Sequence, residues 1–298
     1  MTNAAARRAR GVLVLALTAA VGACSKADKA PPVATVSFSV SKSRIALGSP
    51  LDMTYKFDVA PTAKIAGDYR VFVHLVDADG VILPWYDDHD PPVPTSQWKP
   101  GQTIQYTRTQ FLPIVPYIGA CTVQVGLYRG DQRLPLSGPN AADRTSMSRS
   151  YTVGTLQLLP QSENIFLVPK AGWNPTEFAA ENPSRQWQWT EKAGVLSLKN
   201  PQHDVWFYLE FDARPDVFDH PQQVTIYSGT RIVTTFSADN NGPVIRRIPV
   251  TAAQLGTSDP TDLRIEVDRT FVPAKLPDGG RDSRELGIRV YHTFVEPR

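Results

Sequence analysis

Cysteine is scarce in this chain, and the apolar stretch near its start is too short to cross a membrane as a helix. Only Cys24 and Cys121 occur among the 298 residues. The apolar stretch spans residues 11–20, about half of the ~20 residues that a transmembrane helix requires. The sequence therefore predicts no membrane-spanning helix there, and any disulfide within the chain must join these two cysteines.

Motifs of nucleophilic, metal-dependent and phosphate chemistry are also missing. The chain has no Gly-x-Ser-x-Gly, no His-Glu-x-x-His and no glycine loop of the kind that holds phosphates. Its five histidines are scattered through separate predicted strands and loops. We therefore expect a protein that is not an enzyme and that needs no cofactor.

The first residues have the organisation of a secretory signal peptide. Three arginines within residues 7–10 precede the apolar stretch, and small residues close it. The closing Val21-Gly22-Ala23-Cys24 resembles the lipobox of bacterial lipoproteins. The resemblance implies cleavage before Cys24 and acylation of that cysteine, and two or more acyl chains hold a protein stably on a membrane. In such lipoproteins Ser25 after the cysteine implies a lipid-anchored location in the cell envelope, at the outer membrane.

Cleavage would change both the charge and the cysteine chemistry of the chain. Removal of residues 1–23 takes away three arginines and no acid, so that 28 basic and 29 acidic side chains remain. A near-neutral protein lacks the basic surface of nucleic-acid-binding proteins, and we exclude nucleic acid as a partner. With Cys24 acylated, Cys121 has no partner, and we expect it to be buried and unreactive in a strand.

Apolar residues alternate with polar ones along most of the remaining chain, which is typical of half-buried strands. Polar, proline-containing residues 24–33 form a linker, and turn signals such as Asp79-Gly80 and Pro100-Gly101 separate the apolar runs that follow. About seven short strands in some 120 residues are the pattern of an immunoglobulin-like sandwich. The expected strands of this first block cover residues 35–40, 51–57, 69–76, 103–111, 122–128 and 148–153, with a further apolar strand in the connection at 156–168.

A second block of strands begins after about residue 160. Ser228-Gly229-Thr230 predicts a hairpin turn, and residues 251–255 predict one helical turn capped by Thr251. The sequence therefore predicts an all-β chain with two antiparallel sandwich domains, immunoglobulin-like at 34–160 and jelly-roll-like at 161–298. The expected strands of the second block cover residues 195–198, 205–211, 224–227, 232–236, 244–250, 263–267 and 287–295.

The second block resembles galactose-binding-like domains, which are related to carbohydrate-binding modules. The resemblance rests on an opening Trp173 and Glu177, on Trp187-Gln188-Trp189 and on a closing segment at 282–290. It covers residues 163–297 and implies a non-catalytic sugar-binding sandwich. The first block, above all residues 71–128, is similar to bacterial immunoglobulin-like domains, which implies no particular function.

The densest polar cluster in the sequence is Trp85-Tyr86-Asp87-Asp88-His89-Asp90. Carboxylate oxygens suit Ca²⁺ or Mg²⁺, so Asp87, Asp88 and Asp90 are candidate metal ligands. The alternative is a hydrogen-bonded loop, because neighbouring side chains of an extended segment point to opposite sides.

Tryptophan supplies the strongest candidates for binding. Sugar-binding sandwiches pack a pyranose ring on an exposed aromatic face beside a few polar groups. Trp187 and Trp189 share one face of a strand, and that face lies either in the core, which we favour, or at a binding surface. Trp206 alternates with Phe207 and Leu209, so one of these two sets faces outward.

Asp282 and Arg284 complete the candidate site. Arg284 either pairs with a carboxylate and fixes the last strand, which we favour, or hydrogen-bonds sugar hydroxyls at the end of the sandwich. The sequence thus predicts a membrane-anchored envelope lipoprotein that binds a partner without catalysis. A glycan is the first hypothesis for that partner, and the alternative is a structural or assembly role in which the sandwiches dock envelope proteins.

Overall fold

The computed structural model describes residues 28–139, 149–181, 185–277 and 280–298. Within these ranges the regular structure is almost entirely β-strand, with one short α-helix and a few 3-10 turns. No helix of the described ranges is long and apolar enough to span a membrane. The signal sequence and Cys24 lie outside the described residues, so the acylation of Cys24 stays a prediction.

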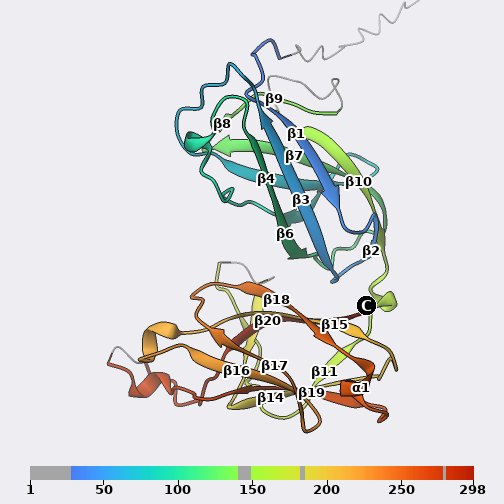
Figure 1. Ribbon diagram of the computed structural model, residues 1–298, viewed down its shortest axis with the longest axis vertical. Helices are drawn as coiled ribbons and strands as arrows, with labels where there is room; N and C mark the ends of the chain where they lie inside the picture. Colours follow the sequence, from blue (N-terminus) through green and yellow to red (C-terminus); the bar gives the residue numbers. More distant parts are fainter. Residues whose placement is uncertain (1–27, 140–148, 182–184, 278–279) are drawn as a thin grey trace, which may run out of the picture.

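Two sheets formed by residues 34–159 face each other in the first sandwich (Figure 1). One sheet has the order β6-β3-β1-β9, and the other has the order β2-β10-β7-β4-β5 with β8 paired to β7. All pairs are antiparallel except β1 with β9 and β10 with β2. The elements are β1 (Ala34–Val40), β2 (Arg44–Ala46), β3 (Pro50–Val59), β4 (Arg70–Val76), β5 (Ile82–Tyr86), η1 (Thr95–Gln97), β6 (Thr103–Phe111), β7 (Gly119–Arg129), β8 (Gln132–Arg133), β9 (Leu136–Ser137) and β10 (Tyr151–Leu159).

Alternation of apolar and polar residues explains the longest of these strands. In β3, Leu51, Met53, Tyr55 and Phe57 are each at most 1% exposed, and the residues between them are less buried. Burying one large apolar side chain contributes about 1.5–3 kcal/mol, so four on one face fix the side of β3 that turns inward. Cys121 of β7 joins the same core at 2% exposure, as expected.

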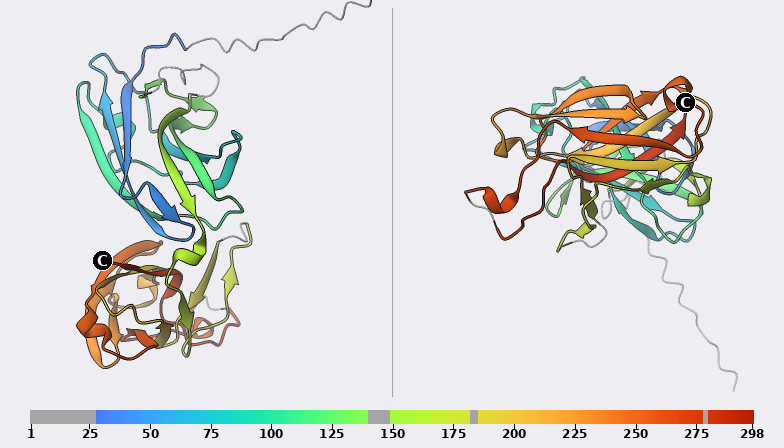
Figure 2. Two further views of the ribbon diagram at one scale, coloured as in Figure 1. Left: turned by 90° about the vertical axis from the view of Figure 1, so that its right-hand side faces the viewer. Right: turned by 90° about the horizontal axis from the view of Figure 1, so that it is seen from below.

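The second sandwich consists of two five-stranded antiparallel sheets, with the orders β11-β14-β19-β16-β17 and β12-β13-β20-β15-β18. From β15 onward the chain passes repeatedly between the two sheets, as in jelly rolls, and Figure 2 (right) shows this sandwich from below. Its elements are η3 (Gln161–Glu163), β11 (Leu167–Pro169), β12 (Glu177–Phe178), β13 (Gln186–Trp189), β14 (Ala193–Leu198), β15 (Val205–Asp212), η4 (Pro215–Val217), β16 (Gln222–Ser228), β17 (Arg231–Ala238), β18 (Val244–Val250), α1 (Ala252–Leu255), β19 (Thr261–Val267), η5 (Pro273–Lys275) and β20 (Arg289–Pro297).

Local signals in the sequence account for two connections of the second sandwich. Gly229 has a positive φ of 58° in the turn between β16 and β17, a conformation that glycine adopts without steric cost. Helix α1 begins with a capping box, in which Thr251 and Gln254 each accept a hydrogen bond from the backbone of the other. Both predictions are confirmed.

The two sandwiches meet where the end of the first lies against the outer face of the β12-β13-β20-β15-β18 sheet (Figure 1). Phe111 of β6 packs against Tyr208 of β15 and Phe294 of β20, with ring centroids 6.4 Å apart in each case. Lys42 forms an ion pair with Glu296 across the same contact. The contact therefore covers the centre of that sheet face, whereas β13 takes no part in this aromatic cluster.

The predicted all-β class with two antiparallel sandwiches is confirmed. The main difference from the sequence prediction is the number and extent of strands in the first sandwich. The short strands β2, β8 and β9 were not expected, and β10 runs on to Leu159, where we expected a break after residue 153. These three strands have only two or three residues, too few for a period to be visible, and the five-residue strand β5 was also not expected.

Candidate functional site

Three side chains lie in a row across the outer face of the β12-β13-β20-β15-β18 sheet. Trp189 of β13 is paired with Arg289 of β20, which is paired in turn with Asp212 of β15. Directly opposed residues of neighbouring strands have their side chains on the same face. The adjacent Val290 and Phe211 point into the main core, so this row faces outward. Trp187 lies on the same face because it is two residues before Trp189.

Asp212 is the buried anchor of this row. It is 1% exposed and accepts two hydrogen bonds from the guanidinium of Arg289, with Nε–Oδ1 and Nη2–Oδ2 distances of 2.8 and 2.5 Å. The hydroxyl of Tyr291 donates a third hydrogen bond at 2.8 Å. Burial, and then the hydrogen bond to Asp212, raise the pKa of Tyr291 to about 12. The hydroxyl is therefore a fixed donor at neutral pH.

A bulge in β20 places consecutive side chains on the outer face. The pairing of β15 with β20 shifts between Glu210 and Phe211, which leaves Tyr291 as the extra residue. Tyr291 then reaches Asp212, and His292 stacks on Phe111 of the first sandwich at 4.9 Å between ring centroids. The bulge thus joins the Asp212 row to the contact between the sandwiches.

One guanidinium lies among three aromatic rings at this site. The carbon of the Arg289 guanidinium is 5.2 Å from the ring centre of Trp187, 5.5 Å from that of Trp189 and 5.3 Å from that of Tyr291. The rings of Trp187 and Tyr291 are 6.1 Å apart. Each exposed cation–π contact contributes roughly 0.5–1 kcal/mol. Arg289 therefore holds the three rings in place, in addition to its ion pair with Asp212.

Glu177 connects Trp187 to the two polar residues predicted near the chain end. It accepts a hydrogen bond from Trp187 Nε1 at 3.0 Å and forms an ion pair with Arg284 Nη2 at 2.8 Å. Arg284 also donates two hydrogen bonds to Asp282, at 2.9 Å from Nε and 2.7 Å from Nη2. The hydrogen bond from Arg284 lowers the pKa of Asp282. Arg284 thus pairs with carboxylates, as we favoured. Its ion pair with Glu177 connects the loop after β19 to β12, and it does not fix the last strand.

The two tryptophans of β13 differ in burial. Trp189 is 7% exposed and packs against Phe271 and Leu286 in a small cluster on the outer face, separate from the main core. Trp187 is only half-buried at the edge of this cluster. The shared face of the two rings is therefore no part of the main core, and only Trp189 is fully covered by other residues.

Trp206 does not join this site. Its ring lies under the guanidinium groups of Arg247 and Arg298, at 4.1 and 4.7 Å, and it packs beside the aromatic contact between the sandwiches. The structure thus brings together Trp187, Trp189, Asp282 and Arg284 from the predicted set and leaves Trp206 apart.

A pocket of about 130 Å³ opens beside Trp187 and Tyr291. Trp173, Gln186 and His292 also line it. Arg185 immediately precedes this lining on the chain, and its guanidinium carbon is 5.4 Å from the ring centre of Tyr291. Figure 2 (left) shows the β12–β13 hairpin, which carries Trp187, extending from the second sandwich toward the first.

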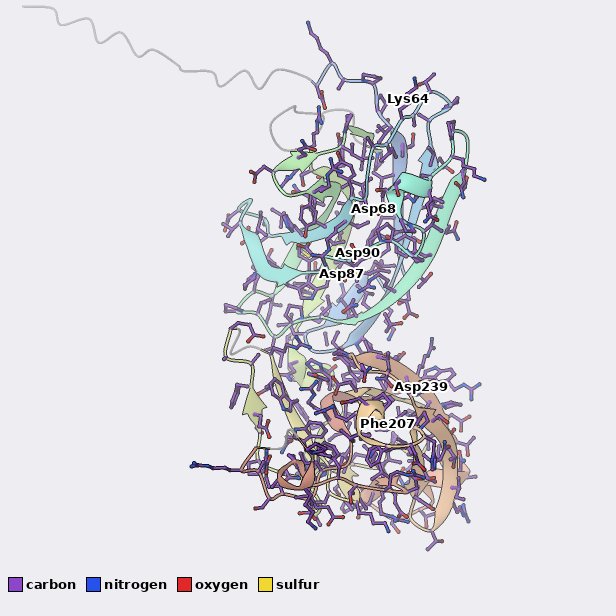
Figure 3. All side chains as sticks on the ribbon, turned by 90° about the vertical axis from the view of Figure 1, so that its left-hand side faces the viewer. Lys64, Asp68, Asp87, Asp90, Phe207 and Asp239 are labelled. Atoms are coloured by element: carbon purple, nitrogen blue, oxygen red, sulfur yellow. The ribbon has the colours of Figure 1, made fainter. Side chains whose placement is uncertain are left out.

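The three carboxylates proposed as metal ligands have different surroundings in the first sandwich, and Figure 3 labels two of them, Asp87 and Asp90. Asp87 is 5% exposed and is bound by the hydroxyl of Tyr55 and by Arg108. Asp88 accepts a hydrogen bond from Tyr128, and Asp90 is exposed beside Arg70. Within the described ranges, no group of three or more histidine, cysteine, aspartate or glutamate side chains is arranged to hold a metal ion. Each carboxylate has a protein partner instead, because alternation along the segment sends neighbours to different sides.

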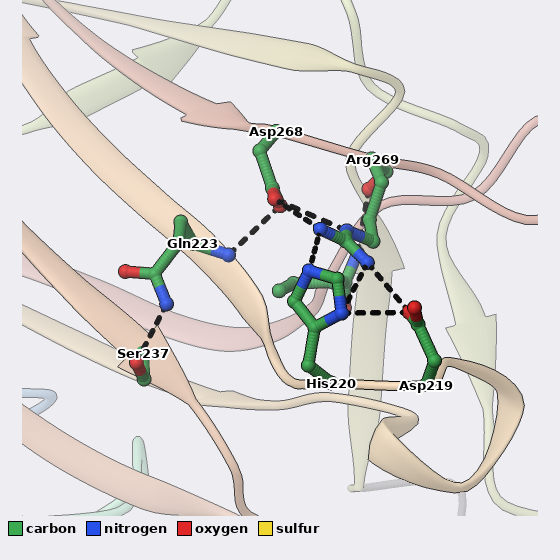
Figure 4. A network of polar contacts seen from close by, with 7 residues as sticks. Asp219, His220, Gln223, Ser237, Asp268 and Arg269 are labelled. Atoms are coloured by element: carbon green, nitrogen blue, oxygen red, sulfur yellow. Dashed lines mark hydrogen bonds and ion pairs between the residues drawn. The ribbon is translucent and has the colours of Figure 1, made fainter.

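Another polar cluster of the second sandwich joins Asp219, His220, Asp268 and Arg269 (Figure 4). Arg269 bridges Asp219 and Asp268, both at 3.0 Å, and also contacts His220. The side chains of Asp219 and His220 are 81% and 55% exposed. The cluster is a surface network that connects the loop before β16 to the end of β19.

Sequence reasoning missed the polar half of the candidate site. Arg289 and Tyr291 lie in a strand that was predicted, and their i, i+2 spacing already places them on one face. Asp212 and Arg185 had no such signal, because their partners are far away in the sequence. Asp212 and Arg289, for example, are 77 residues apart.

Comparisons with known proteins are weak. No protein-family model and no curated protein matches the chain. The chain is similar to the sporulation control protein Spo0M from Bacillus subtilis, at 14% identity over 76% of this chain and 93% of that one, with a TM-score of 0.27. It is also similar to the CBM51-2 and INT domains of Clostridium perfringens ZmpB, at 10% identity over 59% of this chain and 38% of that one, with a TM-score of 0.24. A third similar structure is the CBM22 tandem of Paenibacillus barcinonensis Xyn10C, at 10% identity over 92% and 95%, with a TM-score of 0.23. At such TM-scores these similarities carry no argument about function.

Proposed function

We propose that this chain is a lipid-anchored protein of the cell envelope whose second sandwich binds a glycan without catalysis. One observation carries the proposal: the half-buried ring of Trp187 lies 6.1 Å from Tyr291 on the outer face of the sheet, and both residues also line a pocket between β13 and β20. Aromatic faces of this kind pack against the apolar side of a pyranose ring, and fixed polar groups around them bind its hydroxyls.

The polar groups of the site are held in position before any ligand arrives. Arg289 and Tyr291 are fixed by Asp212, and Glu177 is fixed by Arg284 and by Trp187. A preorganised site loses little conformational entropy on binding. The same contacts support a non-catalytic role, because the two carboxylates nearest to the rings, Asp212 and Glu177, are both engaged in holding neighbouring side chains.

Binding should depend on Trp187 and not on Trp206. The test uses the chain from Ser25 onward, first on a glycan array and then by calorimetry with the glycans that bind. We expect Trp187→Ala to weaken binding about tenfold or more, since a stacked ring contributes on the order of 1 kcal/mol beyond its buried area, whereas Trp187→Phe retains part of the affinity. Trp206→Ala is the matched control, because it removes the same side chain from the same sheet. Absence of any glycan ligand, or equal losses in both variants, would contradict the proposal.

The lipid anchor is tested through the two cysteines. We expect Cys24→Ala to move the protein from the membrane fraction to the soluble fraction, or to leave the signal peptide uncleaved. Cys121→Ala is the control and should remain in the membrane fraction. Full membrane retention of Cys24→Ala would show that the anchor lies elsewhere.

A second candidate function is the docking of envelope proteins. It is favoured by apolar side chains at and next to the edge strands β11 and β12, where Phe166, Val168 and Phe178 are 58, 49 and 57% exposed. Exposed apolar groups of this size mark interaction surfaces when they lie together. Crosslinking in cells distinguishes the two functions: one stable protein partner that is lost on Phe178→Ser favours docking over glycan binding.

A further inference from the structure

We propose that the outer-face rings of Trp187 and Tyr291 bind a sugar that carries a carboxylate, a uronic acid residue, and that Arg185 binds this carboxylate. The inference rests on the proposed glycan-binding function and specifies its ligand class. Uronic acids combine a pyranose ring, which suits the two aromatic faces, with a planar anion, which suits a guanidinium.

Arg185 differs from the other arginines of the site in its partners. Arg289 is bound to Asp212, Arg284 to Asp282 and Glu177, and the neighbouring Arg214 to Asp216 at 2.7 Å. Arg185 is exposed, and within the described ranges no ion pair joins it to a carboxylate of the chain. Its own position is fixed at the backbone, where its carbonyl accepts a hydrogen bond from the Ala179 amide at 2.9 Å. The guanidinium of Arg185 is therefore not occupied by any carboxylate of the described ranges, and a ligand carboxylate can bind it.

The geometry around Arg185 suits a carboxylate. Its guanidinium carbon lies 5.4 Å from the ring centre of Tyr291, and a guanidinium next to an aromatic ring presents its planar fork for two parallel hydrogen bonds to a carboxylate. The nearest acids do not repel such a ligand strongly. Asp212 is 1% exposed and paired with Arg289, and Glu177 shares the positive charge of Arg284 with Asp282.

The test compares uronate oligosaccharides with their carboxyl-reduced, neutral counterparts. The probes are oligomers of galacturonate, glucuronate, mannuronate and guluronate, measured by calorimetry against the chain from Ser25 onward. We expect at least one uronate to bind about tenfold more tightly than its neutral counterpart, the size expected for a hydrogen bond to a charged group. The preference should shrink at high salt, because the pair is partly exposed.

Substitutions assign the preference to one side chain. Arg185→Gln should abolish the tenfold preference while binding of the neutral oligomer stays unchanged, and Arg185→Lys should retain part of it. Arg264→Gln is the matched control, since Arg264 lies 4.0 Å over Tyr227 on the other sheet and is paired with Glu266. Equal binding of charged and neutral oligomers overturns this inference alone and leaves the glycan function standing. A preference that survives Arg185→Gln, or equally tight binding of a sulfated oligomer without carboxylates, also overturns it. No binding of either set overturns the inference and counts against the proposed function as well.

Discussion

Each sandwich contains a buried aspartate bound by an arginine and a tyrosine, but the two networks face different surroundings. Asp87 of the first sandwich accepts a hydrogen bond from Tyr55, which is fully buried in the core between the sheets. Asp212 of the second sandwich accepts one from Tyr291, which is half-buried on an outer sheet face. Each aspartate has an arginine and a tyrosine as partners, and Asp87 also contacts His89. The two tyrosines differ in their position relative to the sheets.

This difference separates a structural role from a binding role. Around Asp87, the rings of Tyr55, Tyr106 and His89 pack against one another and against the core, with ring centres 5.1–5.6 Å apart. Around Asp212, the ring of Tyr291 turns toward Trp187 and the pocket. A network whose tyrosine is buried in the core stabilises the fold, whereas a network whose tyrosine lies half-buried on an outer face also orients groups toward a ligand.

The largest effect should follow from removal of the covered carboxylate. Asp87→Ala leaves Arg108 and the hydroxyl of Tyr55 without their partner, and breaking a buried ion pair costs about 3–5 kcal/mol. We expect a loss of this size in the free energy of unfolding of the first sandwich, measured by urea denaturation, with glycan binding retained under native conditions. Asp90→Ala is the control, because its carboxylate is 82% exposed, and it should change the stability by less than about 0.5 kcal/mol. Similar losses in both variants would contradict a structural role specific to Asp87.

The open network should respond more weakly in stability and more strongly in binding. In Asp212→Asn, Arg289 loses its ion pair, but the amide oxygen still accepts a hydrogen bond, and Tyr291 is only half-buried whereas Tyr55 is fully buried. We expect a loss of about 1–3 kcal/mol in the free energy of unfolding, together with loss of glycan binding, because Arg289 and Tyr291 are no longer fixed. Asp216→Asn changes another arginine-bound but exposed carboxylate and should leave both quantities nearly unchanged. If Asp212→Asn bound glycan as the wild type does, the comparison between the two networks would fail.

The smallest effect is a difference in acid sensitivity. Burial by itself raises the pKa of Asp87, but hydrogen bonding and charge from His89 and Arg108 outweigh it, and the pKa is lower than usual. A carboxyl with a lowered native pKa stabilises the fold above its unfolded pKa of about 3.9, and this stabilisation is lost as pH falls through the lower native value. The wild-type free energy of unfolding should therefore decline more steeply below about pH 4 than that of Asp87→Asn. Parallel curves for the two proteins would show that Asp87 does not contribute to acid unfolding.

Local features of the sequence were sufficient to predict most strands, one turn and one helix cap. Period-two patterns predicted β3, β6, β7 and most strands of the second sandwich, because burial of one strand face is encoded in neighbouring residues, and an apolar run predicted β4. The turn at Gly229 and the cap of α1 at Thr251 were also predictable, since each depends on residues no more than three positions apart. The short strand β9 was not, because its pairing with the distant strand β1 is what makes it regular.

The candidate site shows the same division between local and distant information. The sequence by itself determined that Trp187 and Trp189 share a face, since side chains of a strand alternate, and that Asp282 lies within reach of Arg284. Only the tertiary structure decided that Phe271 and Leu286 cover Trp189 while Trp187 stays partly open, that Arg289 finds Asp212, and that Trp206 lies under Arg247 and Arg298. The physical reason is that side-chain direction follows from local backbone geometry, whereas burial and charge pairing depend on strand register between segments far apart in the chain.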